Sequence, residues 1–144
     1  MRHADSETLT DLLLSLARHL HHEIKSRSDD ALNPTQVQAL FFIRFRPKPL
    51  MSEIASYLSI RPPSATTLVA ELQKMKLVER ETDPTDKRSI RISLTQKGRS
   101  LIQQRLHLVT ERITELTKPL SSTEREQFIQ LLDRILSPIN QPSV

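Results

Sequence analysis

The sequence of 144 residues has no cysteine, no tryptophan and a single glycine, Gly98. Without cysteine the chain forms no disulfide, and thiolate catalysis and thiol-based oxidant sensing are excluded. A single glycine argues against an all-β fold, because tight hairpins need many residues with positive φ. Aromatic residues make up only 3% of the chain, so aliphatic side chains have to fill most of the core.

Features of membrane proteins and of enzymes are also missing. Residues 1–6 are polar and lack the apolar stretch of a signal peptide. No apolar run approaches the roughly 18 residues of a membrane span. Neither a glycine-rich phosphate loop nor a Ser-His-Asp arrangement in a familiar context is present. We therefore expect a cytoplasmic protein with no membrane partner, no enzymatic activity and no cofactor.

Positive charge is concentrated in the middle of the chain. The net charge is +4, and residues 61–99 hold nine Lys or Arg against five Asp or Glu, an excess equal to that whole net charge. The segments on either side carry equal numbers of positive and negative side chains. A basic central segment favours a polyanionic partner such as nucleic acid, although a solvated surface of mixed charge would have the same composition.

The first half of the chain has the periodicity of helices. An apolar stripe with steps of three and four residues begins at Leu9 and ends at Ile24. A second helix is expected from Asn33, with Pro34 at its first position and Gln36 completing a capping box. Two short helices follow, at 51–58 and 62–77, and the linker 59–61 between them is short. This pairing is the signature of a helix-turn-helix.

The period then changes to that of β-strands. Residues 77–81 and 89–94 alternate apolar and polar side chains, and the polar segment 82–88 between them favours turns. We interpret the unit as a β-hairpin with a charged tip, which is a wing. Thr95 can cap a long helix that follows, and Ser121 with Glu124 forms a capping box for a last one.

Several of these motifs resemble the MarR family of winged helix-turn-helix transcriptional regulators. The wing segment carries Leu77-Val78-Glu79-Arg80, Asp83-Pro84, Asp86-Lys87-Arg88 and then Leu94-Thr95 with Gly98. Upstream, Ile54-Ala55 with Leu58 and then Pro62, Ser64 and Thr66 resembles the helix-turn-helix of the family. The resemblance extends over essentially the whole chain. It implies a mainly α fold with a small β-hairpin wing and flanking dimerisation helices.

By this resemblance the protein binds double-stranded DNA. The N-terminal residues of the recognition helix would enter the major groove, and the expected contacts are Arg61, Pro62, Pro63, Ser64, Thr66 and Thr67. Arg88 at the wing tip would enter the minor groove, with Asp86 bracing its guanidinium. Lys87 and Arg91 would contact phosphates. The alternative for the helix residues is ordinary exposed surface. The alternative for Arg88 and Asp86 is a surface ion pair that contributes little to stability.

Four positions depart from the family pattern. Ser59 and Lys76 stand where the family often has glycine, so we expect strained or altered turns there. Arg61 replaces a small capping hydroxyl, and Thr67 stands where an arginine often contacts DNA. The base preference of relatives therefore does not transfer to this chain.

The outer helices are expected to form a homodimer. They would be an N-terminal dimerisation helix in residues 1–32 and two C-terminal helices in residues 100–144, around a DNA-binding domain in residues 33–99. Their apolar stripes exceed what one small subunit can cover; packing within the chain is the alternative. The expected contacts are Leu9, Leu12, Leu13, Leu16, Ile102, Leu106, Val109, Ile113, Leu116, Phe128, Leu132 and Ile135.

Two further hypotheses remain open from the sequence. The first is a metal-responsive regulator, because His19 is spaced three residues from His22 and four from Glu23 on one helix. Solvated polar positions on an amphipathic helix explain the same residues, so no metal site is assigned. The second is a helical interaction protein that uses only the apolar heptad positions of the long helix after Thr95, which leaves the wing unexplained. These positions are Ile102, Leu106, Val109, Ile113 and Leu116. The resemblance also implies a pocket for a small-molecule effector. We further expect the protein to be a repressor.

Overall fold

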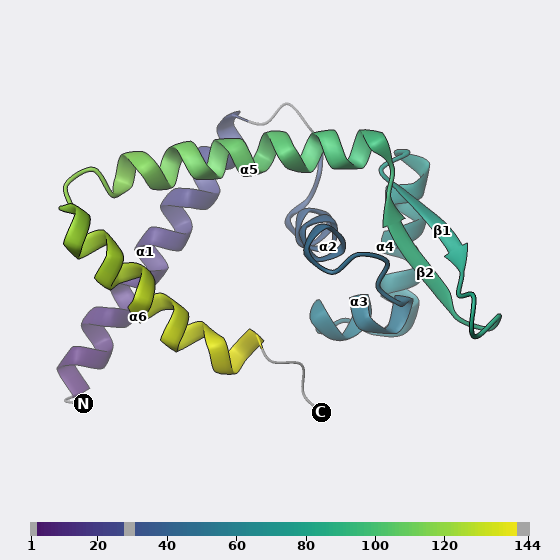
Figure 1. The fold of residues 1–144 in the computed structure, drawn as a ribbon, viewed down its shortest axis with the longest axis horizontal. Helices are drawn as coiled ribbons and strands as arrows, with labels where there is room; N and C mark the ends of the chain where they lie inside the picture. Colours follow the sequence, from purple (N-terminus) through teal and green to yellow (C-terminus); the bar gives the residue numbers. More distant parts are fainter. Residues whose placement is uncertain (1–2, 28–30, 141–144) are drawn as a thin grey trace. The chain divides into compact units, whose positions relative to one another are not determined.

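The computed structural model describes residues 3–27 and 31–140 of the chain (Figure 1). The elements in chain order are α1 (His3–Arg27), α2 (Pro34–Phe45), α3 (Met51–Tyr57), α4 (Pro62–Lys74), β1 (Val78–Thr82), β2 (Ile90–Leu94), α5 (Gln96–Leu116) and α6 (Ser122–Asn140). The chain forms two compact units that meet within α5, between His107 and Leu108. The first contains α1 to β2 and the first turns of α5; within it, we call the part from α2 to the first turns of α5 the winged unit.

The helix starts follow the expected capping chemistry. The Asn33 side chain accepts from the Gln36 amide at 2.9 Å, and the Gln36 side chain accepts from the Asn33 amide at 3.0 Å. The Thr95 hydroxyl accepts from the Gly98 amide at 3.0 Å. These bonds satisfy amides that have no partner inside the helix. The last helix, α6, continues through Pro138 to Asn140.

The core of the winged unit is aliphatic, as the scarcity of aromatic residues predicts. Leu40, Ile54, Leu72 and Ile92 are fully buried and come from α2, α3, α4 and β2. Each such side chain contributes about 1.5–3 kcal/mol by leaving water. Ile102 of α5 is also fully buried here. The first turns of α5 therefore belong to the same core as the recognition helix.

The sheet contains more backbone pairing than the sequence predicts. β1 and β2 are antiparallel, with Val78 opposite Leu94 and Thr82 opposite Ile90. Leu50, in the loop between α2 and α3, forms an additional antiparallel bridge to Arg91. The Ile92 amide also donates to the Pro49 carbonyl at 2.9 Å. This bridge joins the hairpin to the helix-turn-helix.

Two helices end in Schellman turns without glycine. Ser59 (φ 52°) follows α3 and Lys76 (φ 60°) follows α4. After α3, the Ser59 amide donates to the Ser56 carbonyl at 3.1 Å and the next amide to Ala55 at 3.0 Å. Glycine is usual at such a position because a side chain there costs about 1–2 kcal/mol. The expectation of strained turns at both positions is confirmed.

Gly98 is needed for a close approach between two backbones. It lies in the first turn of α5, and a Cβ atom on it would lie 2.1 Å from the Leu77 carbonyl oxygen. The same oxygen accepts from the Thr95 amide at 3.0 Å. The start of α5 therefore lies directly against the backbone that leads into β1.

Four of the five aromatic residues lie on α2 and α3. The rings of Phe41 and Phe45 stack at 6.3 Å, and those of Phe42 and Tyr57 at 4.3 Å. Phe45 and Tyr57 are more than half exposed. Aromatic side chains therefore border the core instead of filling it.

Candidate DNA interface

The N-terminal face of α4 is anchored on one side and open on the other. Ala65, Leu68, Val69 and Leu72 face the core, while the six residues that the sequence singles out are exposed, namely Arg61, Pro62, Pro63, Ser64, Thr66 and Thr67. The two prolines occupy the first turn, where they disrupt no helical hydrogen bond. The buried stripe fixes the helix while the opposite face stays accessible.

The threonine hydroxyls on this face already have acceptors. Thr66 Oγ1 donates to the Pro62 carbonyl and Thr67 Oγ1 to the Pro63 carbonyl, each at 3.1 Å. Such back-bonding to the preceding turn is common for hydroxyls within helices. What remains for a ligand is the methyl group and an acceptor lone pair. The two threonines therefore offer contact to methyl groups and to hydrogen-bond donors.

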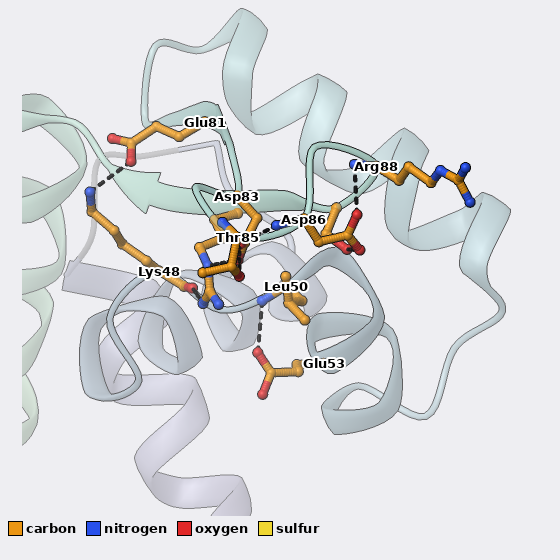
Figure 2. Close-up of polar contacts among 10 residues, drawn as sticks. Lys48, Leu50, Glu53, Glu81, Asp83, Thr85, Asp86 and Arg88 are labelled. Carbon is orange, nitrogen blue, oxygen red and sulfur yellow. Dashed lines mark hydrogen bonds and ion pairs between the residues drawn. The ribbon is translucent and has the colours of Figure 1, made fainter.

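The wing tip is organised around the buried carboxylate of Asp83. Its Oδ1 accepts from the Thr85 amide at 2.7 Å and the Asp86 amide at 3.0 Å, and also from the Thr85 hydroxyl (Figure 2). Oδ2 pairs with the Arg91 guanidinium. These bonds, those from Thr85 first, hold the pKa of Asp83 far below its ordinary value. The tip keeps its shape through this carboxylate, with no glycine in it.

Asp86 supports the tip in a different way from the one predicted. Its carboxylate accepts from the backbone amide of Arg88 at 3.0 Å and from the Ser89 hydroxyl at 2.8 Å. The Arg88 amide, and then the Ser89 hydroxyl, lower the pKa of Asp86. The expected bond from Asp86 to the Arg88 guanidinium is wrong, because the carboxylate is used by the turn.

The guanidinium of Arg88 extends away from the tip, as Figure 2 shows. The side chain is exposed and has no ion-pair partner within residues 3–27 and 31–140. Lys87 beside it is exposed as well. A cation on a braced hairpin tip is therefore available for an external anion.

Arg91 has an internal role that the sequence analysis did not predict. Its Nε pairs with Asp83, and its Nη1 donates to the Lys48 carbonyl at 2.9 Å. The side chain is about one-third exposed, at 35%. Its guanidinium joins the wing to the α2–α3 loop, and the contact with a phosphate stays a prediction.

Arg80 is a residue of this face that the sequence reasoning missed. It lies on β1, and its Nη2 donates to the carbonyl of Thr66 at 3.4 Å. Its Nε is buried and has no hydrogen-bond partner among the described residues. Arg80 therefore lies between the recognition helix and the wing. The one signal in the sequence was its place in the Leu-Val-Glu-Arg motif.

The residues of the expected dimer interface divide into two groups. Ile102 is fully buried in the winged unit, and Leu106 packs against the same core. The surface of Ile102 is therefore used within the chain, which corrects its place in an intersubunit seam. In contrast, apolar residues of α1 and α6 are exposed by between about a third and two-thirds, including Leu9, Leu12, Leu13, Leu16, Phe128 and Ile135. Ile113 is 40% exposed, and Val109, Leu116 and Leu132 are half-buried.

The hypothesis of a metal site at His19, His22 and Glu23 has no support in the described side chains. No group of three potential metal ligands comes together among the side chains that the structure describes. The Glu23 side chain lies outside the described residues. None of the described helices has the length and hydropathy that a membrane crossing requires.

Proteins with similar sequences are transcriptional regulators. Residues 32–89 match the MarR family. The transcriptional repressor MprA of Escherichia coli is 26% identical over 147 residues, which cover 97% of this chain and 84% of MprA. An uncharacterised HTH-type transcriptional regulator of Mycobacterium leprae is 28% identical, over 98% of this chain and 99% of the relative.

Solved structures agree as well. A MarR family protein from Bacillus stearothermophilus superposes with a TM-score of 0.87 at 20% identity, over 98% of this chain and 99% of that one. The repressor CouR, solved on a 23-mer DNA duplex, gives 0.68 at 27% identity over 89% of each chain. The wing motif, the winged fold and these matches together show that the chain is similar to the MarR family of transcriptional regulators over nearly its whole length.

Proposed function

We propose that the protein is a homodimeric repressor that binds a pseudo-palindromic site in double-stranded DNA. The N-terminal face of α4 enters the major groove, and Arg88 enters the minor groove beside it. The observation that carries the proposal is the free Arg88 guanidinium on a tip that two carboxylates hold in place. Narrow minor grooves of A·T-rich DNA attract such a guanidinium. The DNA-bound CouR and the repressor MprA support this assignment by analogy.

The recognition helix and the wing contribute different kinds of contact. Thr66 and Thr67 present methyl groups and acceptors, which favour thymine methyls and the amino groups of adenine or cytosine. Arg88 reads little beyond groove width and A·T content. Base preference therefore comes from α4, whereas a general part of the affinity comes from the wing. Arg61 and Lys87 add contacts to phosphates or bases at the two ends of this surface.

The exposed outer helices support the proposed dimer. Apolar side chains of α1 and of α6 are exposed, exposed apolar patches mark interaction sites, and a second copy offers a self-complementary partner. Twofold symmetry then requires two half-sites spaced by about 10 base pairs or a multiple.

The test begins with selection of bound fragments from random duplex DNA. Affinity for the selected site is then measured by fluorescence anisotropy at several salt concentrations. We expect a symmetric site and a log–log salt slope of roughly −0.9 per phosphate contacted. A best site without symmetry, or binding that does not respond to salt, contradicts the proposal.

Substitutions then test the wing. Arg88→Ala should weaken binding by about 1–3 kcal/mol per half-site, with a larger loss where the flanks are A·T-rich. Lys118→Ala removes an exposed cation in the turn after α5 and serves as the control, with little change expected. If Arg88→Ala leaves the affinity intact in a folded dimer, the wing does not contact DNA.

A further inference from the structure

One line of residues on α4 lies directly opposite the side of the helix that is buried in the core. The buried residues of α4 fall on one side, between Ala65 and Leu72. Residues three and four positions apart lie above one another on a helix, so the opposite side carries Pro63, Thr67, Ala70 and Lys74. All four residues are exposed. We call them the outer line.

The outer line offers apolar groups over its first two turns. Pro63 and Ala70 have no polar side-chain atom, and Thr67 has a methyl group beside its hydroxyl. That hydroxyl donates its hydrogen to the Pro63 carbonyl at 3.1 Å. Lys74, in the last turn of α4, is the first cation on the line. A base that lies against the first two turns therefore meets no side-chain hydrogen-bond donor of the outer line.

Polar side chains near the outer line are engaged with other elements or lie at its edges. The carboxylate of Glu71 accepts from the Gln36 side chain of α2 at 3.0 Å. Arg80 of β1 donates to the Thr66 carbonyl at 3.4 Å, and Arg61 precedes the first turn of the helix. Cations are therefore available at the ends and the edge of this surface, while its centre is apolar.

The bases of DNA differ in what they present to such a surface. In the major groove guanine presents two acceptors, whereas thymine presents one acceptor and the methyl group on C5. A guanine acceptor that is covered by an apolar surface loses its hydrogen bonds to water and gains none in return, which is unfavourable. A thymine methyl group against alanine or threonine only leaves water, which is favourable. The chemistry of the outer line therefore fits methyl groups.

We propose that the outer line recognises the methyl group on C5 of pyrimidines. The bases under the first two turns of α4, which we call the half-site core, contain T·A pairs whose thymine methyl groups contact Pro63, Thr67 and Ala70. Methyl recognition rests on the proposed function, because it concerns the bases that α4 meets in the major groove. A cytosine methylated at C5 carries the same group at the same ring position, so it is recognised as well.

Uracil substitution tests the methyl groups one at a time, because uracil pairs as thymine does and lacks only the methyl group. Affinity for the selected duplex is measured by fluorescence anisotropy at one salt concentration. Uracil in the half-site core should weaken binding by about fourfold for each contacted methyl group, the value for one buried carbon of this size. Uracil in the flank that Arg88 reads is the control, since the methyl group lies in the other groove.

Two results of this measurement contradict methyl recognition. The first is a selected half-site core without T·A pairs. The second is an affinity that stays unchanged with uracil at every core thymine.

Methylation of cytosine gives the complementary measurement. A T·A pair of the half-site core is changed to C·G, which should weaken binding, and the cytosine is then methylated at C5. The two C·G duplexes differ by the methyl group alone, so methylation should recover about fourfold in affinity. The same pair of duplexes with the change outside the selected site is the control. A methylated duplex that binds no better than the unmethylated one rejects the proposal.

Two substitutions of Thr67 separate its methyl group from its hydroxyl. Thr67→Val replaces the hydroxyl by a second methyl group, and Thr67→Ser removes the methyl group and keeps the hydroxyl. The position is exposed, so both variants should fold. Thr67→Val should bind at least as tightly as the parent. Thr67→Ser should bind about fourfold more weakly and lose the response to uracil at one thymine.

The order of the two variants decides which group of Thr67 is used. If Thr67→Val binds more weakly than Thr67→Ser, or if both bind equally, methyl recognition is wrong. Salt-dependent binding of a symmetric site without any response to uracil also rejects methyl recognition, but it leaves the proposed function intact. If the chain binds no duplex DNA at all, the proposed function and methyl recognition are both wrong.

Discussion

The winged unit and the outer helices differ in how completely each buries its own apolar side chains. In the winged unit, Leu40, Ile54, Leu72 and Ile92 have no exposed surface. In α1 and α6, Leu12 is 63% exposed and Ile135 is 59% exposed. The helices of both regions have the same apolar periodicity in sequence. The difference teaches that an apolar stripe identifies a face to be covered, but does not say whether the chain itself covers it.

The largest expected effect disrupts the winged unit. Gly98→Ala places a methyl group against the Leu77 carbonyl, 2.1 Å from its oxygen. The start of α5 then has to move away from the core, at a cost of about 3 kcal/mol or more. Urea denaturation monitored by circular dichroism measures the loss. Ser100→Ala, an exposed position two residues along α5, should stay within about 0.5 kcal/mol of the parent.

A variant of the outer helices should separate the subunits without unfolding the winged unit. Leu12→Lys with Ile135→Lys removes two side chains whose burial contributes about 1.5–3 kcal/mol each. Sedimentation at micromolar concentration should change from about twice the chain mass of 16.6 kDa to that mass. Gln130→Lys, on exposed surface of α6, is the control for added charge. If the parent chain itself sediments as a monomer, the proposed dimer is wrong.

The helix-turn-helix should become more stable when glycine is introduced. Ser59→Gly and Lys76→Gly relieve a left-handed backbone at each Schellman turn, and each should add about 1 kcal/mol to the free energy of unfolding. Ser56→Gly, one turn earlier and helical, should lower it by about 0.5–1 kcal/mol. Equal effects at positions 56 and 59 would contradict the role of positive φ.

The smallest expected effect concerns pH and the wing. The pKa values of Asp83 and Asp86 lie below the ordinary 3.8. A carboxylate with a lowered pKa contributes stability that is complete above the ordinary value and is lost as the pH falls through the lowered one. Amide NMR shifts of Thr85 and Arg88 should therefore hold at and below the ordinary pKa of 3.8 and change only as the pH falls through the lowered pKa values. In Asp83→Asn the same shifts should be altered already at neutral pH.

Local features of the fold could be predicted from the sequence. The capping pairs, the periodicity and the alternation in the hairpin depend on residues a few positions apart, so the pattern contains them. The strained turns at Ser59 and Lys76 were also predictable, since both positions lack the usual glycine. The resemblance to a known family added the roles of α4 and the wing.

Contacts over long sequence distance could not be predicted. Arg91 lies 43 residues from its partner Lys48, and nothing near Arg91 distinguishes it from a surface cation. Arg80 contacts Thr66 only because the strand returns along the recognition helix. The periodicity of α5 assigned Ile102 to the dimer interface, because the core residues and the expected interface residues lie on one apolar stripe of that helix.

The stacking of Tyr57 on Phe42, at 4.3 Å between ring centroids, supplies a spectroscopic label that needs no mutation. Tyr57 is the single tyrosine in a chain without tryptophan, so the intrinsic emission excited near the tyrosine band comes from one site. That site is the end of α3, two residues before the turn into the recognition helix. Changes in the lifetime or quenching of the Tyr57 fluorescence therefore report on the helix-turn-helix alone, because the outer helices contain neither tyrosine nor tryptophan.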